Sequence, residues 1–412
     1  MPLLVMKFGG TSVADLARIR GAAEKVAAEV ARGHDVIVVV SAMAGKTNEL
    51  VGWVGSISPL YDAREYDAVV ASGENVTAGL MALTLQEMGI PARSWHGWQV
   101  PLRTTSAHGS ARILEIPRTN IDAKFREGMK VAVVAGFQGL SPEGRITTLG
   151  RGGSDTTAVA FAAAFDAVRC DIYTDVDGVY TTDPRITRKA RKLDRIAFEE
   201  MLELASLGAK VLQTRSVELA MRYSVPLRVL SSFEETLETS GTIVCAEEEL
   251  METNVVAGVA HSRDEAKVTL THVQDRPGIA AAIFGPLADA GVNVDMIVQN
   301  ISDGGQTDMT FSCPVDQVLR AERAMTEAMA RGDISFDALV ADTEVAKVSV
   351  VGIGMRSHAG VAARMFAALA AEGINIKVIT TSEIKISVLI DRKYMELAVQ
   401  ALHDAFELHR PG

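Results

Sequence analysis

An internal repeat in the last third of the chain constrains the fold more than any other feature of the sequence. The run that begins at Gly278 matches the run that begins at Gly360 without a gap, at an offset of 82 residues (360 − 278). The residues that recur in the same order are Phe284 and Phe366, Leu287 and Leu369, Ala288 and Ala370, Gly291 and Gly373, Asn293 and Asn375, and Ile297 and Ile379. Each copy has the pattern of a strand, a helix that opens at glycine, a glycine turn and a second strand. We therefore expect two small α+β ferredoxin-like domains, at 265–342 and 343–412.

The start of each repeated helix is a candidate binding site for a small anion. A helix that begins at Gly278 or Gly360 presents unpaired backbone N–H groups, which favour a ligand such as a carboxylate. The same pattern fits a duplicated packing module without a ligand, and the sequence leaves both interpretations open. It also leaves open whether each copy is contiguous in sequence.

The first 245 residues alternate between strand and helix signals. A first helix is expected between a cap at Ser12 and a stop at Gly33. The other predicted elements are strands at 3–8, 35–40, 129–135 and 170–174 and helices at 68–88 and 156–165. Such alternation implies a mainly parallel sheet with helices on both faces. The expected fold class is α/β, with a three-layer α/β/α domain over 1–245 that ends at the acidic stretch 246–252.

Composition narrows the compartment and the partners. The formal net charge of −11 argues against broad binding to nucleic acid or to an anionic membrane. Three widely spaced cysteines suggest neither a disulfide framework nor a zinc site. We expect no signal peptide and no apolar run of membrane-spanning length, which leaves the cytoplasm as the default compartment.

A strand–glycine–helix junction at residues 7–12 is the first candidate phosphate site. Lys7 ends a strand, Gly9 and Gly10 let the backbone approach a ligand, and a helix then begins. Open α/β sheets bind ligands at the carboxyl ends of their strands, where Lys7 lies. Taken alone, a plain turn with a surface lysine explains these residues equally well.

The segment 40–47 imitates a phosphate-binding P-loop. Its second half, Gly45-Lys46-Thr47, fits the pattern, but Val40 stands where the first glycine belongs. A β-branched residue resists the tight turn required there. We interpret the segment as a polar loop whose Ser41 and Thr47 hydroxyls face a substrate, and a degenerate P-loop is the less favoured alternative.

Residues 147–157 are the richest polar segment. Glycine-rich backbone leads into a helix, which is a second anion cradle. Arg151 can grip a carboxylate through two parallel hydrogen bonds. Asp155 falls in the first helical turn, where a negative charge is favoured and can orient lysines.

Three further signals are weak in isolation. Glu74 suits either a ligand ammonium group or the start of a helix. Residues 174–180 contain a turn signal at Asp177-Gly178, and the segment resembles a calcium loop without its distal glutamate. Lys210 is expected at a break in a helix. The scattered histidines form no triad or metal cluster, which argues against acyl or glycosyl hydrolysis.

Together these segments resemble the aspartate kinases of the amino-acid kinase family. The matching segments, in the family's order, are 7–12, 41–43 with Thr47, 72–74, 147–157, 174–185 and 207–210. The C-terminal repeat resembles the paired ACT domains of that family, so the resemblance covers essentially the whole chain. It implies transfer of the γ-phosphoryl group of ATP to the β-carboxylate of L-aspartate, with Mg²⁺, at the head of lysine, threonine and methionine biosynthesis.

The resemblance also assigns roles to residues. Lys7 and Lys210 would neutralise the phosphoryl group in flight, organised by Asp155. Nucleotide contacts would come from Gly9, Gly10, Thr174, Asp175, Tyr180, Arg185 and Lys210. Arg151 would hold the α-carboxylate of aspartate and Glu74 its ammonium group. The rest of the substrate pocket would be Ser41, Thr47, Gly152, Gly153 and Ser154, and no residue is assigned as a metal ligand.

Feedback control by lysine, threonine or both follows from the ACT resemblance. The candidate effector contacts are Asp275, Gly278, Ala280, Asn293, Val294, Asp295, Gln299, Asn375, Ile376 and Glu383. We expect a homo-oligomer, or an α2β2 assembly with a short regulatory subunit that starts near Met251. The alternatives are a kinase for glutamate or acetylglutamate, an ACT-based amino-acid sensor with an inactive kinase domain, and a P-loop switch.

Overall fold

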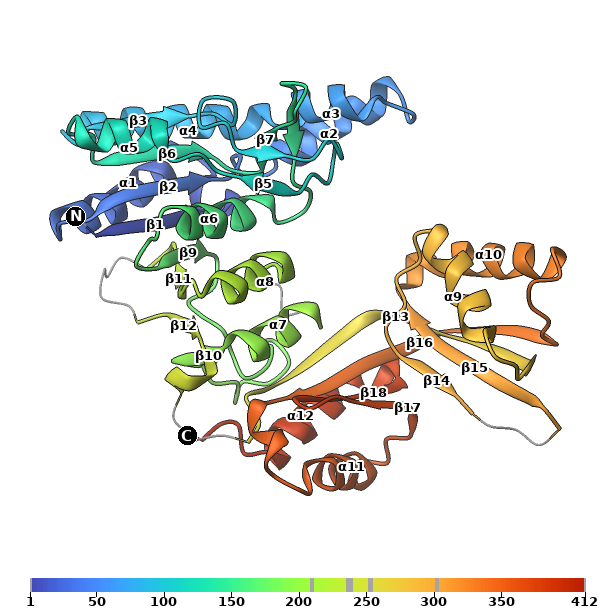
Figure 1. The fold of residues 1–412 in the computed structure, drawn as a ribbon. Helices are drawn as coiled ribbons and strands as arrows, with labels where there is room; N and C mark the ends of the chain where they lie inside the picture. Colours follow the sequence, from blue (N-terminus) through green and yellow to red (C-terminus); the bar gives the residue numbers. More distant parts are fainter. Residues whose placement is uncertain (1, 208–210, 235–239, 251–254, 301–303, 411–412) are drawn as a thin grey trace. The chain divides into compact units, whose positions relative to one another are not determined.

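The structure is a computed structural model that describes residues 2–207, 211–234, 240–250, 255–300 and 304–410. It divides into two compact units, Met1–Tyr180 with Lys192–Thr253, and Thr181–Arg191 with Asn254–Gly412 (Figure 1).

The first unit is built on a twisted eight-stranded sheet. Its strand order is β10-β12-β11-β9-β1-β2-β6-β3. The run from β11 to β3 is parallel, whereas β12 pairs antiparallel with β11. The strands are β1 Leu3–Phe8, β2 Asp35–Val40, β3 Ala92–Trp95, β6 Val131–Ala135, β9 Cys170–Thr174, β10 Arg195–Ala197, β11 Leu227–Ser231 and β12 Thr242–Cys245. The predicted mainly parallel sheet is confirmed.

Helices cover both faces of this sheet (Figure 1). α1 and α4 pack on β2, and α4 also covers β6 and β3, whereas α6 lies against β1, β2 and β9 and contacts α8. The helices are η1 Gly10–Val13, α1 Leu16–Ala31, α2 Lys46–Ile57, α3 Ala63–Val70, α4 Ser72–Glu87, α5 Thr119–Arg126, α6 Gly153–Ala164, α7 Phe198–Ser206 and α8 Thr214–Tyr223. A small second sheet contains β4 Arg103–Thr104, β5 Ile113–Glu115, β7 Gln138–Leu140 and β8 Ile146–Thr148.

Alternation along β1 decides which residues reach the functional edge. Leu4, Met6 and Phe8 join the apolar core that α1 and α4 cover. Because successive side chains of a strand point to opposite faces, Val5 and Lys7 face the other way, toward α6. Lys7 is therefore aimed at the start of α6.

Two local predictions are wrong. Asp15, not Ser12, caps α1, because its side chain accepts the Arg18 N–H while Ser12 lies in η1. The single helix predicted at 68–88 is two helices, α3 and α4, that meet at Ala71. The run Ala63–Glu87 is long and apolar enough to cross a membrane by length and composition, but half of its apolar 18-residue window is buried, as in a core helix.

The second unit contains one six-stranded antiparallel sheet, in the order β14-β15-β13-β16-β18-β17. Its strands are β13 Gly258–Gln274, β14 Ile297–Gln299, β15 Gln306–Cys313, β16 Ala338–Val351, β17 Ile376–Thr381 and β18 Lys385–Asp391. Its main helices are α9 Ile279–Asp289, α10 Val318–Ala330, α11 Val361–Ala371 and α12 Met395–Ala405. The repeat is confirmed in three dimensions, because α9 and α11 begin after Gly278 and Gly360, both left-handed, with φ of 89° and 98°.

Two long strands each serve both copies of the repeat (Figure 1). The second half of β13, from Glu265, pairs with β15 and with the first half of β16, which completes a contiguous first copy. The first half of β13, Gly258 to Ser262, pairs with residues 347–351 of β16, which also pair with β18. The second copy therefore takes its fourth strand from residues that precede the first copy.

Candidate active site

A buried ion pair lies at the carboxyl edge of the parallel sheet. Lys7 Nζ is 2.5 Å from Asp155 Oδ1, and each residue is only 8% exposed. Lys7 is the penultimate residue of β1, and Asp155 is the third residue of α6. A negative charge is favoured in a first helical turn, so α6 stabilises the carboxylate that holds the lysine. The structure thus brings together two residues 148 positions apart (155 − 7) that were assigned to catalysis.

Beside this pair, the loop Gly9-Gly10 is tightly confined at Gly10 and in ordinary contact with its neighbours at Gly9. A side chain at Gly9 would lie 3.4 Å from Lys7 Nζ, and one at Gly10 would lie 3.0 Å from the Ala42 carbonyl oxygen. The Gly9 N–H donates to the Tyr173 carbonyl oxygen at 3.2 Å. The role predicted for that N–H, donation to an ATP phosphate, would require this bond to be exchanged.

The turn into α6 requires its glycines. Gly152 has φ of 71°, and a side chain there would lie 2.0 Å from Cγ of Gln213. Gly153 packs against Phe137, with no room for a side chain. Arg151 is exposed at this turn, and Ser154 is buried. The backbone therefore presents Arg151 outward while Ser154 and Asp155 face inward.

The same turn is anchored by a buried carboxylate, Asp67, which was not singled out from the sequence. Asp67, fully buried in α3, accepts hydrogen bonds from the Thr148 hydroxyl at 2.5 Å and the Gly109 N–H at 3.1 Å, and it lies 2.7 Å from His108 Nδ1. Arg215 donates to the carbonyl oxygens of Leu149 and Ala111. The only available signal was an acid inside an apolar helical run, because its partners are distant in sequence.

Glu74 is a buried carboxylate, and only one of its two oxygens has a hydrogen-bond partner among the described residues. Oε1 accepts the Ala42 N–H at 3.1 Å, and among the described residues Oε2 has no hydrogen-bond partner. Burial raises the pKa of Glu74 to about 7, against the lowering effect of the Ala42 N–H. The Ala42 contact places Glu74 beside the loop after β2, which contains Ser41 and leads to Thr47 in the first turn of α2.

The predicted nucleotide residues fall into two groups. Thr174 ends β9, and its hydroxyl donates to Asp175 at 3.2 Å. The Tyr180 hydroxyl donates to Asp177 at 2.9 Å. Arg185 belongs to the second unit, where its guanidinium is bound to Asp183. Lys210 lies outside the described residues, as does Met251.

Most candidate effector residues of the first repeat copy separate into two groups at opposite ends of α9. Asp275, Gly278 and Ala280 lie at its start, whereas Asn293, Val294 and Asp295 follow its end. Gln299 ends β14, which runs in the same direction as β13 and therefore returns toward the start of α9. A helix of 11 residues is roughly 16 Å long, so one small amino acid cannot touch both groups in a single copy. The second group is tied down, because the Asn293 N–H donates to Gln317 and the Asp295 carboxylate lies 2.6 Å from Lys347 Nζ.

In the second copy, Asn375 is exposed immediately before β17, which Ile376 begins. Glu383 lies in the turn between β17 and β18, 3.4 Å from Arg356. Lys347, buried between Glu265 and Asp295, was not singled out from the sequence, where it is one polar residue in a strand.

Comparison with known proteins supports one family along the whole chain. The amino acid kinase family matches residues 2–231, and the ACT domain matches residues 267–330 and 348–406. The aspartokinase of Pseudomonas aeruginosa is 55% identical over 100% of this chain and 99% of its own length.

Solved structures give the same result. Aspartokinase III of E. coli in complex with aspartate and ADP (R-state) has a TM-score of 0.81 and 28% identity, over 98% of this chain and 100% of that one. The same enzyme in complex with lysine and aspartate (T-state) has a TM-score of 0.77 and 28% identity, over 98% of this chain and 99% of that one. The chain therefore belongs to the amino acid kinase family, and within it to the aspartokinases.

Proposed function

We infer that this chain is an aspartate kinase, which transfers the γ-phosphoryl group of ATP to the β-carboxylate of L-aspartate and yields 4-phospho-L-aspartate. The observation that carries the inference is the buried Lys7–Asp155 pair at the carboxyl edge of the sheet. It stands in a chain that is 55% identical to a named aspartokinase over its full length.

The reaction needs charge compensation more than it needs acid–base catalysis. The β-carboxylate of aspartate has an ordinary pKa of about 3.9, so it is already ionised at neutral pH and needs no general base. The barrier comes from bringing this anion toward the anionic γ-phosphate. We assign Lys7 the role of neutralising the phosphoryl group as it moves, with Asp155 holding the ammonium group in place.

Aspartate would be bound through its own charged groups. The unpartnered, buried Oε2 of Glu74 suits the α-ammonium group, because an incoming cation would satisfy both its charge and its hydrogen-bonding capacity. Exposed Arg151 would close on the α-carboxylate as a bidentate partner. Ser41, Thr47 and Ser154, with the Gly152-Gly153 backbone, would line the remainder of the pocket.

The nucleotide would lie along the same edge. Gly10 and the ends of β1 and β9 are the proposed phosphate contacts, and Thr174, Asp175, Tyr180, Arg185 and Lys210 remain proposed contacts from the resemblance. Mg²⁺ would arrive bound to ATP, because this ion keeps water and phosphate oxygens as ligands, and it would neutralise phosphate charge. The exposed carboxylate of Asp175 fits that oxygen-rich setting.

Regulation is proposed for the second unit. Lysine, threonine or both would bind near the candidate residues of the repeat and inhibit the kinase. Because a helix roughly 16 Å long separates Asn293, Val294 and Asp295 from the residues at its start, a complete site needs those three residues from another subunit. This supports an oligomer, either of full-length chains or with a short subunit that starts near Met251, in the cytoplasm.

The test is MgATP-dependent turnover with the acyl phosphate trapped by hydroxylamine. We expect aspartyl hydroxamate from L-aspartate, and a lower yield when lysine or threonine is added. Product from L-glutamate or N-acetyl-L-glutamate, but not from aspartate, would reassign the substrate. An absence of product from all three substrates would contradict the kinase assignment itself.

A further inference from the structure

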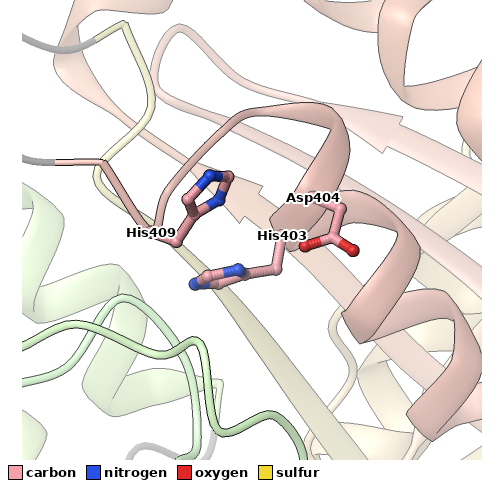
Figure 2. A group of neighbouring side chains, drawn as sticks. All are labelled: His403, Asp404 and His409. Atoms are coloured by element: carbon pink, nitrogen blue, oxygen red, sulfur yellow. The ribbon is translucent and has the colours of Figure 1, made fainter.

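A group of two histidines and one aspartate lies at the carboxyl end of α12, in the second unit. Within the described part of the chain, His403, Asp404 and His409 are the one set of three such residues whose ligand atoms all lie within 4.8 Å of one another (Figure 2). None of them belongs to the proposed kinase site or to the candidate effector residues. A binding role here would be separate from phosphoryl transfer.

The backbone builds this arrangement. After α12 the Glu407 N–H donates to the Asp404 carbonyl oxygen and the Leu408 N–H to the His403 carbonyl oxygen, both within 3.1 Å. Glu407 adopts the left-handed conformation, with φ of 54°. This pair of bonds is the Schellman turn that ends many helices. It reverses the chain and carries His409 back over the end of the helix, so that its imidazole lies next to that of His403 (Figure 2).

His403 has a buried nitrogen with nothing to bind. The residue is fully buried, and Nδ1 has no hydrogen-bond partner among the described residues. Its other nitrogen, Nε2, lies 3.0 Å from the Thr181 hydroxyl oxygen, which also accepts the Arg191 N–H. If Nε2–H donates to Thr181, then Nδ1 carries the free lone pair. A histidine that ligates a metal is commonly fixed in this way, by a hydrogen bond from its other nitrogen.

We propose that His403, His409 and Asp404 form a binding site for a divalent transition-metal ion of the zinc class. Two imidazole nitrogens and a carboxylate oxygen are a common ligand set for Zn²⁺, and imidazole suits Zn²⁺, Cu²⁺ and Ni²⁺ better than it suits Mg²⁺. Water would complete the coordination. This site uses none of Lys7, Asp155 and Glu74. A test of zinc binding is therefore independent of the proposed kinase activity.

The geometry leaves room for a small closure. With Zn–N bonds of about 2.0–2.1 Å, ligand atoms of a tetrahedral site lie about 3.4 Å apart, whereas the present spacing is bounded only by 4.8 Å. His409 and Asp404 are exposed and can rotate, whereas buried His403 stays fixed. Asp404 also holds Lys189, whose Nζ is 2.8 Å from Oδ2. This exposed ammonium group competes with a metal ion for the carboxylate.

The test is zinc titration calorimetry on the full-length protein without a histidine tag, after dialysis against a chelator and with Mg²⁺ present. His409→Ala removes an exposed ligand, so the fold should be retained. His358→Ala is the matched control, because it removes another exposed histidine of the same unit. Lys189→Ala tests the competition for Asp404. X-ray absorption at the zinc edge of the loaded protein reports the ligands directly.

We expect one zinc ion per chain in the wild type and in His358→Ala, with two imidazoles in the absorption spectrum. His409→Ala should bind at least about 10-fold more weakly, because removal of even an outer-shell partner of a metal ligand typically costs about 10- to 100-fold in affinity. Lys189→Ala should bind more tightly. Equal zinc binding by His409→Ala and the wild type, or a spectrum without imidazole ligands, would overturn the proposal, and so would the absence of binding by the wild type.

Discussion

Replacing Glu74 by glutamine should stabilise the first unit at alkaline pH and at the same time weaken the binding of aspartate. Burial raises the pKa of Glu74 from its ordinary 4.5 to about 7. Between these two values the folded chain holds a proton that the unfolded chain has lost, so stability falls as pH rises through this window. A shift of 2.5 units (7 − 4.5) corresponds to about 3 kcal/mol, fully lost above pH 7 and fully regained below pH 4.5.

Tryptophan fluorescence can measure this effect in the correct unit. Trp53, Trp95 and Trp98 are the chain's three tryptophans, and all lie in the first unit. Urea unfolding of wild type and Glu74→Gln should give free energies of unfolding that differ little at pH 5. At pH 8.5 the variant should gain up to about 3 kcal/mol, less about 1 kcal/mol for its unpaired amide.

The control is Glu87→Gln, at the exposed end of the same helix, where the side chain is 64% exposed and pairs with Arg20. Its free energy of unfolding should follow that of the wild type at both pH values, because surface ion pairs contribute little. Parallel pH profiles for wild type and Glu74→Gln would refute the argument, since the buried carboxylate would then not be the titrating group.

The same substitution separates stability from binding. If the ammonium group of aspartate pairs with Oε2, glutamine replaces a charge-assisted hydrogen bond worth about 1.5–3 kcal/mol, which raises KM for aspartate by roughly 10- to 150-fold. The wild-type KM should also fall as pH rises through 7, because only the ionised carboxylate attracts the ammonium group. An unchanged KM in the variant would remove Glu74 from the substrate site.

Three further substitutions probe the other sites. Lys7→Met should destabilise the first unit by about 3–5 kcal/mol, because it leaves Asp155 buried and unpaired. The double variant Lys7→Met with Asp155→Asn should recover most of that stability but lose at least about 100-fold in kcat. Recovered turnover in the double variant would argue against a catalytic role for Lys7. Gly152→Ala places a side chain against Gln213 at a residue with positive φ. Hydroxamate formation should therefore fall, while tryptophan fluorescence still reports a folded unit. Full activity would show that the α6 turn tolerates the change. Asp295→Asn removes the charge of the partly exposed partner of Lys347. The concentration of lysine or threonine that gives half-inhibition should change about 10-fold, while the kcat without inhibitor stays constant. An unaltered response would exclude this loop from the effector site.

The sequence predicts correctly the features that depend only on a local hydrophobic pattern and on the rule that ligands bind at the carboxyl ends of parallel strands. The strands 3–8, 35–40 and 170–174 were predicted to the residue, because short apolar runs ended by glycine or polar residues define buried parallel strands. Since these strands are parallel, their carboxyl ends meet at one edge, and the residues that follow them lie together. The meeting of Lys7 with Asp155 then follows from the alternation along β1.

Sequence reasoning failed where partners are set by packing between distant segments. Asp67 meets His108 and Thr148 only because α3 lies against β8, and no local pattern encodes that contact. The break at Ala71 has no clear local signal either, because alanine favours a helix and the nearby Gly73 lies within α4 rather than at the break. The cap at Asp15 was missed because η1 delays the start of α1 by one turn, so a capping signal at Ser12 was read one turn too early.

The exchanged strand of the second unit has a consequence for regulation that a pair of independent domains would lack. Because β13 and β16 each run through both copies, a shift of the first copy's sheet is transmitted along continuous backbone rather than across a sliding surface. Lys347 adds a second link, since it lies on the part of β16 that belongs to the second copy and contacts Glu265 and Asp295 of the first. Lys347 and Glu265 are both buried, so separating the copies would leave Lys347 as an uncompensated buried charge. The two copies are therefore expected to respond to an effector as one body.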